Sequence, residues 1–234
     1  MRTPATDTDS PVKTEPLTDL PTERAADPDP SAPAPVPAVA RHRPFGLVLL
    51  VTGVVGWVAS AILVLERLEL YEDAGHITSC DINPWVSCGL VMGTWQSELF
   101  GFPNPLIGIV GFTVVLTAAA GMLSGARFGE WYWLALQAGV TFGVVFVHWL
   151  AFQSLYRIGA LCPYCLVVWA VMIPLFLSVT LRNLQRWQLS LPRPARAALA
   201  VAVDYRSTIL TAWYLTIALL ALQRFWFYWS TLLP

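Results

Sequence analysis

The sequence predicts an all-α, polytopic membrane protein that consists of a four-helix bundle and a fifth transmembrane helix. Three observations predict this class. Hydrophobic residues make up 56% of the chain, whereas soluble domains hold about 45–50%. The apolar residues gather in five runs, each close to the length that crosses a bilayer. The chain also holds 11 Trp, 11 Phe and 7 Tyr, which suits a protein with many rings at membrane–water boundaries.

The five apolar runs give the expected helices in order. A bilayer crossing takes about 20 helical residues. Charged or polar residues border the runs, so we expect each helix to end close to the end of its run. The expected helices cover residues 45–65, 105–123, 131–152, 161–181 and 207–222.

The first 44 residues differ from the rest of the chain. They contain ten of the 18 prolines and almost no large apolar side chain. Such a segment cannot bury enough surface to offset the entropy of ordering it, so it predicts a disordered cytoplasmic tail. The expected domain organisation is then a tail, a four-helix domain, a cytoplasmic loop and a C-terminal part with the fifth helix, over residues 1–44, 45–182, 183–206 and 207–234.

The arginines indicate how the helices cross the membrane. With a cytoplasmic N-terminus, the inner flanks of the helices carry eight arginines and the outer flanks carry three. This excess on the inner side predicts a multi-pass protein of the cell membrane whose loop 67–104 faces outward. The formal net charge is −1, so nothing in the charge indicates a nucleic-acid partner.

All four cysteines of the chain lie on this predicted outer side. Cys162 and Cys165 form a C-x-x-C motif at the start of a helix, while Cys80 and Cys88 lie in the loop 67–104. The helix dipole and the free N–H groups of the first turn favour a thiolate at the motif. Disulfides form and persist outside the cytosol. The layout therefore indicates a dithiol relay between the loop and the helix.

Other interpretations of the cysteines stay open. A C-x-x-C pair can be buried and inert, and two pairs can be static structural disulfides. Four thiolates can also bind Zn²⁺, although the seven residues between Cys80 and Cys88 exceed the gaps of about two to four that are typical of zinc sites. Spacing and topology favour the relay over these alternatives, and we expect no metal site.

Three stretches of the sequence resemble the vitamin K epoxide reductase family. They are the loop segment Ser79-Cys80-Asp81-Ile82-Asn83-Pro84-Trp85-Val86-Ser87-Cys88, the segment Phe102-Pro103-Asn104-Pro105 and the segment Leu161-Cys162-Pro163-Tyr164-Cys165. The resemblance extends over residues 45–182. It implies a four-helix catalytic domain that surrounds a quinone, with a fifth helix beside it.

The resemblance implies a role for each cysteine. Cys165, one turn inside the helix, is the thiol that meets the quinone. Cys162 receives electrons from the loop pair through a transient disulfide with Cys88. Cys80 exchanges with an external partner protein.

The resemblance also indicates residues around the quinone. Asn104 corresponds to a side chain that hydrogen-bonds a quinone oxygen. Trp169 stands where vertebrate members have a tyrosine, so a hydroxyl donor is missing there. Thr94 and Asp81 resemble the small hydroxyl residue and the acid that accompany the loop cysteines. His148, an ionisable residue inside a helix, is a further functional candidate, although a hydrogen-bonded packing histidine is the favoured explanation because the residue is alone and near the outer end of its helix.

The expected function is that of a membrane thiol–disulfide oxidoreductase. It would reoxidise a separate extracytoplasmic thioredoxin-fold protein, pass the electrons to a membrane quinone (menaquinone or ubiquinone), and so support disulfide formation in exported proteins. The alternatives are reduction of a quinone epoxide by the same thiols, a thiolate metal-binding membrane protein, and a scaffold with static disulfides.

Overall fold

The computed structural model describes residues 38–73 and 75–226, and their side chains from residue 43 onward. Most of the predicted tail and the last eight residues of the predicted C-terminal part lie outside these described residues. The described residues all belong to one compact unit, which starts at Val36.

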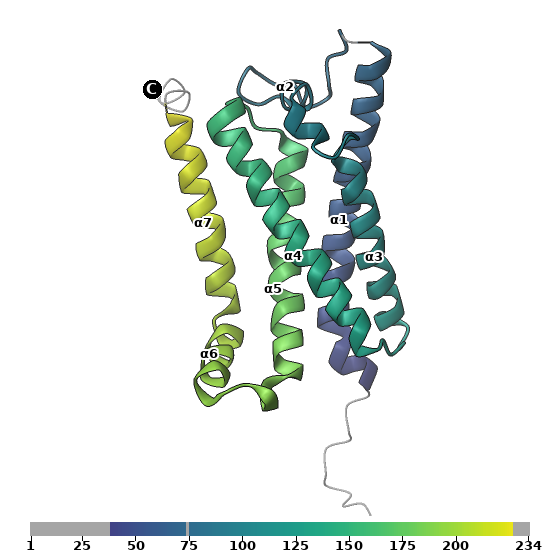
Figure 1. The fold of residues 1–234 in the computed structure, drawn as a ribbon, viewed down its shortest axis with the longest axis vertical. Helices are drawn as coiled ribbons and strands as arrows, with labels where there is room; N and C mark the ends of the chain where they lie inside the picture. The colour runs from purple at the N-terminus through teal and green to yellow at the C-terminus, as the bar shows by residue number, and fades with distance from the viewer. Residues whose placement is uncertain (1–37, 74, 227–234) are drawn as a thin grey trace, which may run out of the picture. The chain divides into compact units, whose positions relative to one another are not determined.

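Within the described residues, four helices are long and apolar enough to span a membrane, and they confirm the predicted fold class (Figure 1). They are α1 (Ala38–Glu72), α3 (Pro105–Leu123), α4 (Glu130–Gln153) and α5 (Pro163–Arg186). The first helix starts earlier and ends later than the predicted run 45–65. Its last two turns carry several charged residues, and two of these, Glu66 and Arg67, bond to Ser79 and Glu98 of the following loop.

The predicted fifth run, 207–222, lies within α7 (Arg206–Arg224), and a further helix precedes it. This helix, α6 (Arg193–Asp204), meets α7 at a bend of 74°. Among the described residues, this pair is long and apolar enough to span a membrane only when the two helices are taken together. The helix α6 occupies a segment for which the sequence predicted only a loop.

Prolines and one glycine determine where the helices near the site begin and end. Pro105 and Pro163 each stand in the first turn of their helix, where a missing N–H costs nothing and the fixed φ angle suits a helix. The helix α4 continues into a π-helical turn, Ser154–Ile158, which ends at Gly159 with φ 76°. This left-handed conformation favours glycine, and it turns the chain toward the start of α5.

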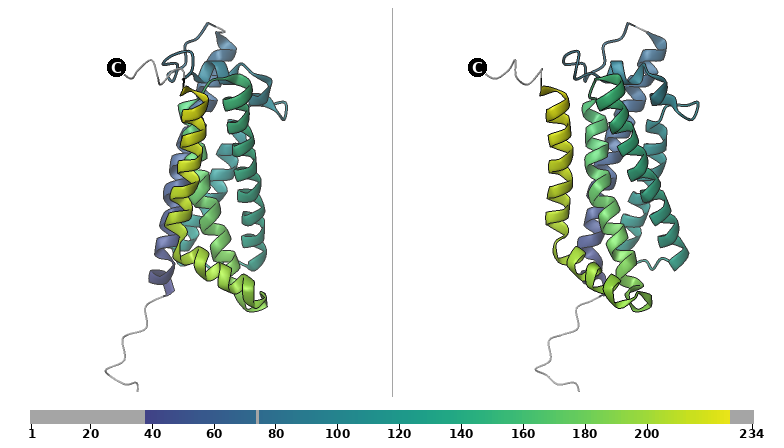
Figure 2. Two further views of the ribbon diagram at one scale, coloured as in Figure 1. Left: turned by 90° about the vertical axis from the view of Figure 1, so that its left-hand side faces the viewer. Right: turned by 60° about the vertical axis from the view of Figure 1, so that its left-hand side comes forward.

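The helix α1 packs against α3 and α5, and α4 packs against α5 (Figure 2). Small residues allow the close approach of α1 and α3. A Cβ atom on Gly56 would lie 2.3 Å from the ring of Phe112, and one on Gly108 would lie 2.3 Å from the hydroxyl of Ser60. A larger side chain at either glycine would force the two helices apart.

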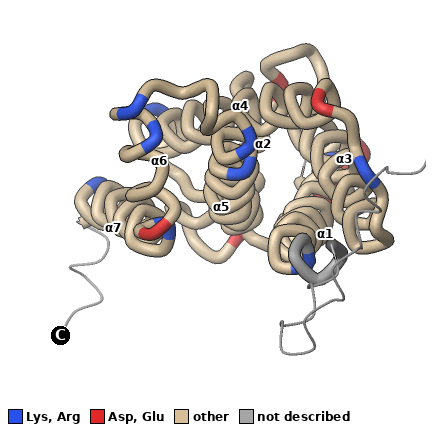
Figure 3. Tube along the Cα trace, turned by 90° about the horizontal axis from the view of Figure 1, so that it is seen from below, with Lys and Arg blue, Asp and Glu red and all other residues tan. Residues whose placement is uncertain are grey.

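The two ends of the bundle differ in chemistry. One end, which we name the cysteine end, carries Cys80, Cys88, Cys162 and Cys165. The other, the arginine end, carries the basic side chains of α6 and the last turn of α5 (Figure 3). A separate buried cluster lies at the cysteine end and consists of Leu63, Cys80, Cys88, Met92 and Cys162.

Candidate active site

A short backbone pairing brings the loop cysteines to the start of α5. Val86 forms a parallel bridge with Leu161. The N–H of Leu161 donates to the carbonyl of Trp85 at 2.7 Å, and the N–H of Ser87 donates to the carbonyl of Leu161 at 3.0 Å. Each of the two paired segments leads directly to a cysteine, Cys88 in one and Cys162 in the other. It therefore places Cys88 beside Cys162.

The four sulfur atoms form two pairs in contact. Cys80 and Cys88 form a disulfide, while Cys162 and Cys165 are free thiols. The Sγ atoms of Cys88 and Cys162 lie 3.0 Å apart, and both residues are buried. Since exchange proceeds by attack of a thiolate on a disulfide sulfur, this contact permits a transfer between the two pairs.

The start of α5 stabilises a negative charge on Cys162. Hydrogen bonding from the Cys165 thiol lowers the pKa of Cys162, and burial opposes this effect without cancelling it. The N–H of Cys165 also donates to the Sγ atom of Cys162, at 3.4 Å. Cys162 is thus the N-cap of α5, and its sulfur replaces the side-chain oxygen that usually fills this role.

Asp81 forms hydrogen bonds that connect the two parts of the loop that carry Cys80 and Cys88. Its Oδ1 atom accepts from the hydroxyl of Ser87 at 2.5 Å and from the N–H of Gly89 at 3.0 Å. Its Oδ2 atom accepts from the N–H of Thr78 at 3.1 Å. Burial disfavours the charged carboxylate, but these hydrogen bonds outweigh burial and lower its pKa. Asp81 therefore joins the segment before Cys80 to the segment around Cys88.

The end of α1 supports the same loop. Both carboxylate oxygens of Glu66 accept from the N–H of Ser79, at 3.1 and 3.2 Å. The Nε2 atom of His76 lies 2.8 Å from a carboxylate oxygen of Glu69 and 3.4 Å from one of Glu66. Further along, the guanidinium of Arg67 binds the carboxylate of Glu98 at 2.5 Å. The loop is thus fixed at both ends to α1.

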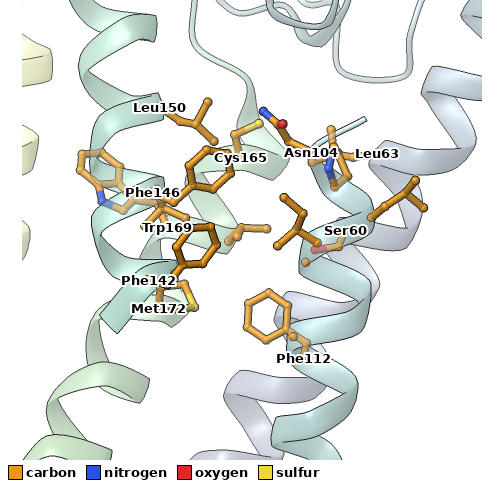
Figure 4. A pocket seen from close by; sticks show the side chains of 18 of the residues that line it. Ser60, Leu63, Asn104, Phe112, Phe142, Phe146, Leu150, Cys165, Trp169 and Met172 are labelled. Carbon is orange, nitrogen blue, oxygen red and sulfur yellow. The ribbon is translucent and has the colours of Figure 1, made fainter. Parts of the chain in front are cut away.

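A large apolar cavity opens beside Cys165 (Figure 4). Its volume is about 800 Å³, and residues of α1, α3, α4, α5 and the loop line it. Phe142, Phe146 and Trp169 lie on one side of the cavity, and Ser60 and Phe112 lie opposite. Cys162 and Cys165 both contribute to the wall. A cavity of this size and character suits a flat, mostly apolar ligand.

The comparison with known families agrees with this geometry. The model of the vitamin K epoxide reductase family matches residues 47–180. The chain belongs to this family. No curated protein sequence matches the chain.

Membership of the vitamin K epoxide reductase family establishes the general activity. The chain is a multi-pass membrane thiol–disulfide oxidoreductase with quinone-linked redox chemistry. The matched residues include all four cysteines and the four long helices except their outermost ends. They exclude α6 and α7.

Asn104 and Thr94, two residues predicted to contact the quinone, already form hydrogen bonds within the protein. Asn104 lines the cavity, but its Nδ2 atom donates to the carbonyl of Gln96 at 2.7 Å and its Oδ1 atom accepts from the N–H of Leu99 at 3.3 Å. The hydroxyl of Thr94 donates to the carbonyl of Val91 at 2.7 Å. Asn104 retains one N–H and one lone pair for a ligand, because an amide has two of each.

Trp169 also lines the cavity, but its polar atom binds another helix. The indole N–H of Trp169 donates to Nε2 of His148 at 3.3 Å, and the indole N–H of Trp213 donates to the same atom at 3.0 Å. Nδ1 of His148 lies 2.7 Å from the carbonyl of Val144. Since a carbonyl only accepts and an indole N–H only donates, His148 is a neutral imidazole that carries its hydrogen on Nδ1.

This network explains the predicted candidate His148. The residue is not among those that line the cavity. It links α4 to Trp169 of α5 and to Trp213 of α7. The helix α7 thereby contacts the wall of the site, although it lies outside the matched family region. Sequence reasoning missed Trp213, and no local pattern around it signals this contact.

The cysteines do not form a metal site in this redox state. The ligand atoms of Cys80, Cys88 and Cys162 lie within 4.8 Å of one another. The disulfide between Cys80 and Cys88 leaves Cys162 as the one thiol of this group. A zinc site needs several thiolates at once, so the arrangement suits thiol exchange better than metal binding.

Proposed function

We propose that the protein transfers electrons from an extracytoplasmic thioredoxin-fold protein to a membrane quinone through its four cysteines. The observation that carries this proposal is the 3.0 Å contact between the sulfur atoms of Cys88 and Cys162. It joins a loop disulfide to a helix dithiol that lines an apolar cavity. A relay needs such a contact, whereas static disulfides have no use for it.

The first half of the relay takes place in the loop. The reduced partner attacks Cys80, which forms a mixed disulfide and releases Cys88 as a thiolate. The second thiol of the partner then resolves this disulfide, so that the partner leaves oxidised and both loop thiols are reduced. Cys80 is only 5% exposed, so the loop must open around it. The exposed side chains of Ile77 and Ile82, on either side of Cys80, offer the partner an apolar contact.

The second half passes the electrons to the helix pair. The Cys88 thiolate attacks Cys162 of an oxidised Cys162–Cys165 pair, and Cys165 leaves as a thiolate. Cys80 then attacks Cys88, which restores the loop disulfide and releases Cys162. The product is a loop disulfide with two free thiols on α5. The structure has this redox state.

The cavity meets the requirements of a quinone. It is apolar, it is bordered by rings of α4, and the Cys165 thiol and the free capacity of the Asn104 amide face it. A bound quinone would accept two electrons and two protons as the Cys162–Cys165 dithiol becomes a disulfide. The chain contributes a water-poor pocket, a thiol and a hydrogen-bond donor. These features suit a quinone.

The orientation of the bundle belongs to the same proposal. Arginines gather at the arginine end, and the positive-inside rule assigns that end to the cytoplasm. The cysteine end would then face the extracytoplasmic side, where thioredoxin-fold proteins introduce disulfides into exported chains. Alkylation of Cys80 and Cys88 in intact cells, after mild reduction, by a reagent that does not cross membranes would test this assignment.

A turnover assay tests the proposed function directly. Purified protein, mixed with a reduced thioredoxin-fold protein and a short-chain quinone, should consume the quinone. Cys165→Ala should abolish this activity, because it removes the thiol beside the cavity. Unchanged turnover in Cys165→Ala would contradict the mechanism. A parallel assay with quinone epoxide measures whether the same thiols also reduce that substrate.

A further inference from the structure

Gln96 is the one side chain of the cavity wall with a buried polar atom that lacks a partner among the described residues. It lies in the short 3-10 helix η1 (Trp95–Glu98) and is 8% exposed. Its Oε1 atom is inaccessible and makes no hydrogen bond. Buried amides almost always have partners, because an unmade hydrogen bond is costly. Because Gln96 also lines the cavity, a rotation of its side chain would bring the amide to a ligand there, and the unpaired oxygen leaves it free to rotate.

The polar groups next to Gln96 all have hydrogen-bond partners. The hydroxyl of Ser97 donates to the carbonyls of Met92 and Thr94, both at 2.7 Å. The hydroxyl of Thr94 is also bound within the loop, and the indole N–H of Trp169 is bound to His148. The loop thus satisfies its own hydroxyl groups. Among the described residues, it leaves the Oε1 atom of Gln96 without a partner.

We propose that the side-chain amide of Gln96 makes a direct polar contact with the quinone ring, a role that rests on the proposed function. A quinone has carbonyl oxygens on opposite sides of its ring, and reduction converts them into hydroxyls. An amide suits both forms, since its N–H donates to a carbonyl and its oxygen accepts from a hydroxyl. A half-turn of the amide exchanges these roles.

Asn104 positions Gln96 for this contact. The Nδ2 atom of Asn104 holds the carbonyl of Gln96, and the N–H of Asn104 donates to the carbonyl of Ser97 at 2.9 Å. The start of α3 therefore fixes the backbone of η1. The Gln96 side chain is then free to bind the ligand while its backbone stays in place.

The substitution Gln96→Met tests the proposal, because methionine keeps the length of the side chain and removes its polar atoms. We expect the KM for quinone to rise about three- to tenfold, as for the loss of one hydrogen bond. Thiol exchange with the partner in the absence of quinone should keep its rate. The thermal midpoint should stay the same or rise, because an unpaired buried amide is removed.

Gln137→Met is the matched control at the arginine end. The amide of Gln137 is already paired, donating to Thr180 at 2.9 Å and accepting from Asn183 at 3.2 Å. We expect this variant to lower the thermal midpoint and to leave the KM for quinone unchanged. The two variants should therefore differ in both measurements: Gln96→Met raises the KM for quinone without lowering the thermal midpoint, and Gln137→Met does the reverse.

The outcomes separate this inference from the proposed function. An unchanged KM in Gln96→Met, or a fall in its thermal midpoint like that of Gln137→Met, would overturn the ligand role of Gln96 while wild-type turnover persists. A wild-type protein that consumes no quinone would instead overturn the proposed function. Fluorescence quenching of the tryptophans by added quinone gives a binding constant that does not depend on turnover.

Discussion

The sulfur atom of Cys88 lies 3.0 Å from that of Cys162, although the two residues are 74 positions apart in sequence. Cys88 is at the same time bound to Cys80. One sulfur therefore contacts both of its exchange partners. A thiol relay needs this arrangement at its central atom.

Removal of the cavity-side thiol should trap the central contact as a covalent bond. In Cys165→Ala, the Cys162 thiolate can attack Cys88 and release Cys80, and Cys165 is no longer present to displace Cys88 from Cys162. Only the return of Cys80 can then undo the product, and rapid alkylation of the Cys80 thiol prevents it. We expect a Cys88–Cys162 disulfide, identified by mass spectrometry of peptides under non-reducing conditions. The double variant Cys162→Ala/Cys165→Ala should lack this cross-link. A Cys80–Cys162 disulfide as the main product would reverse the assigned order of the loop cysteines.

The pH dependence of this trapping should reveal what stabilises the Cys162 thiolate. Hydrogen bonding from Cys165 lowers the pKa of Cys162, and a serine hydroxyl can replace the thiol as a donor. Trapping should therefore persist to lower pH in Cys165→Ser than in Cys165→Ala, where the loss of the donor raises the pKa again. The rate of cross-link formation as a function of pH measures this shift. Identical profiles would show that the Cys165 side chain has no such effect.

Asp81→Asn should loosen the loop that carries Cys80 and Cys88. An amide presents an N–H where the carboxylate now accepts from Thr78 or from Ser87 and Gly89, so at least one contact becomes unfavourable. We expect faster reduction of the Cys80–Cys88 disulfide by dithiothreitol and faster hydrogen exchange over residues 78–89. Glu72→Gln, at the exposed end of α1, is the control and should leave both rates unchanged.

The same carboxylate gives the loop a defined acid sensitivity. The pKa of Asp81 is lower in the folded loop than in an unfolded chain, so its contribution is complete above the unfolded value of about 3.9. It is lost as the pH falls through the folded value. Hydrogen exchange over residues 78–89, corrected for its intrinsic pH dependence, should rise only in acid. Asp81→Asn should remove this acid step.

His148 of α4 should stabilise the protein because its Nε2 atom accepts hydrogen bonds from α5 and α7. His148→Leu leaves the indole N–H groups of Trp169 and Trp213 without their acceptor, at a cost of about 1–3 kcal/mol. Trp213→Phe removes one donor only and should cost less, about 0.5–1.5 kcal/mol. His148→Gln, whose oxygen can accept, should recover part of the loss.

Thermal unfolding in one detergent ranks these variants. Tyr214→Phe is the matched control, because it removes a different bond between α7 and α5, from the Tyr214 hydroxyl to the carbonyl of Ala170 at 2.5 Å. It should resemble Trp213→Phe in stability but leave the fluorescence of Trp169 unchanged. If His148→Leu were no less stable than Trp213→Phe, the shared acceptor would have no special role.

Sequence reasoning predicted the helical elements of the site well. The second apolar run coincides with α3 (Pro105–Leu123), and the prolines that begin α3 and α5 were visible in the sequence. Hydropathy and helix-start signals are local, so they can be recognised without the fold. The late end of α1 could not be recognised in this way, because Glu66 and Arg67 bond to Ser79 and Glu98 of the following loop. The sequence also did not indicate the bend of 74° between α6 and α7.

The sequence by itself determined that this is a helical membrane protein, where its long apolar helices lie, and which thiols lie at one end. Composition, charge and spacing suffice for these features, because they follow from the transfer of side chains between water and lipid. The family resemblance implied the meeting of Cys88 and Cys162, and the tertiary structure shows the contact. Only the tertiary structure decided that Trp169 faces His148 and Trp213, and that the Oε1 atom of Gln96 has no partner among the described residues. Each of these depends on hydrogen-bond partners from distant segments, and such partners are chosen by packing.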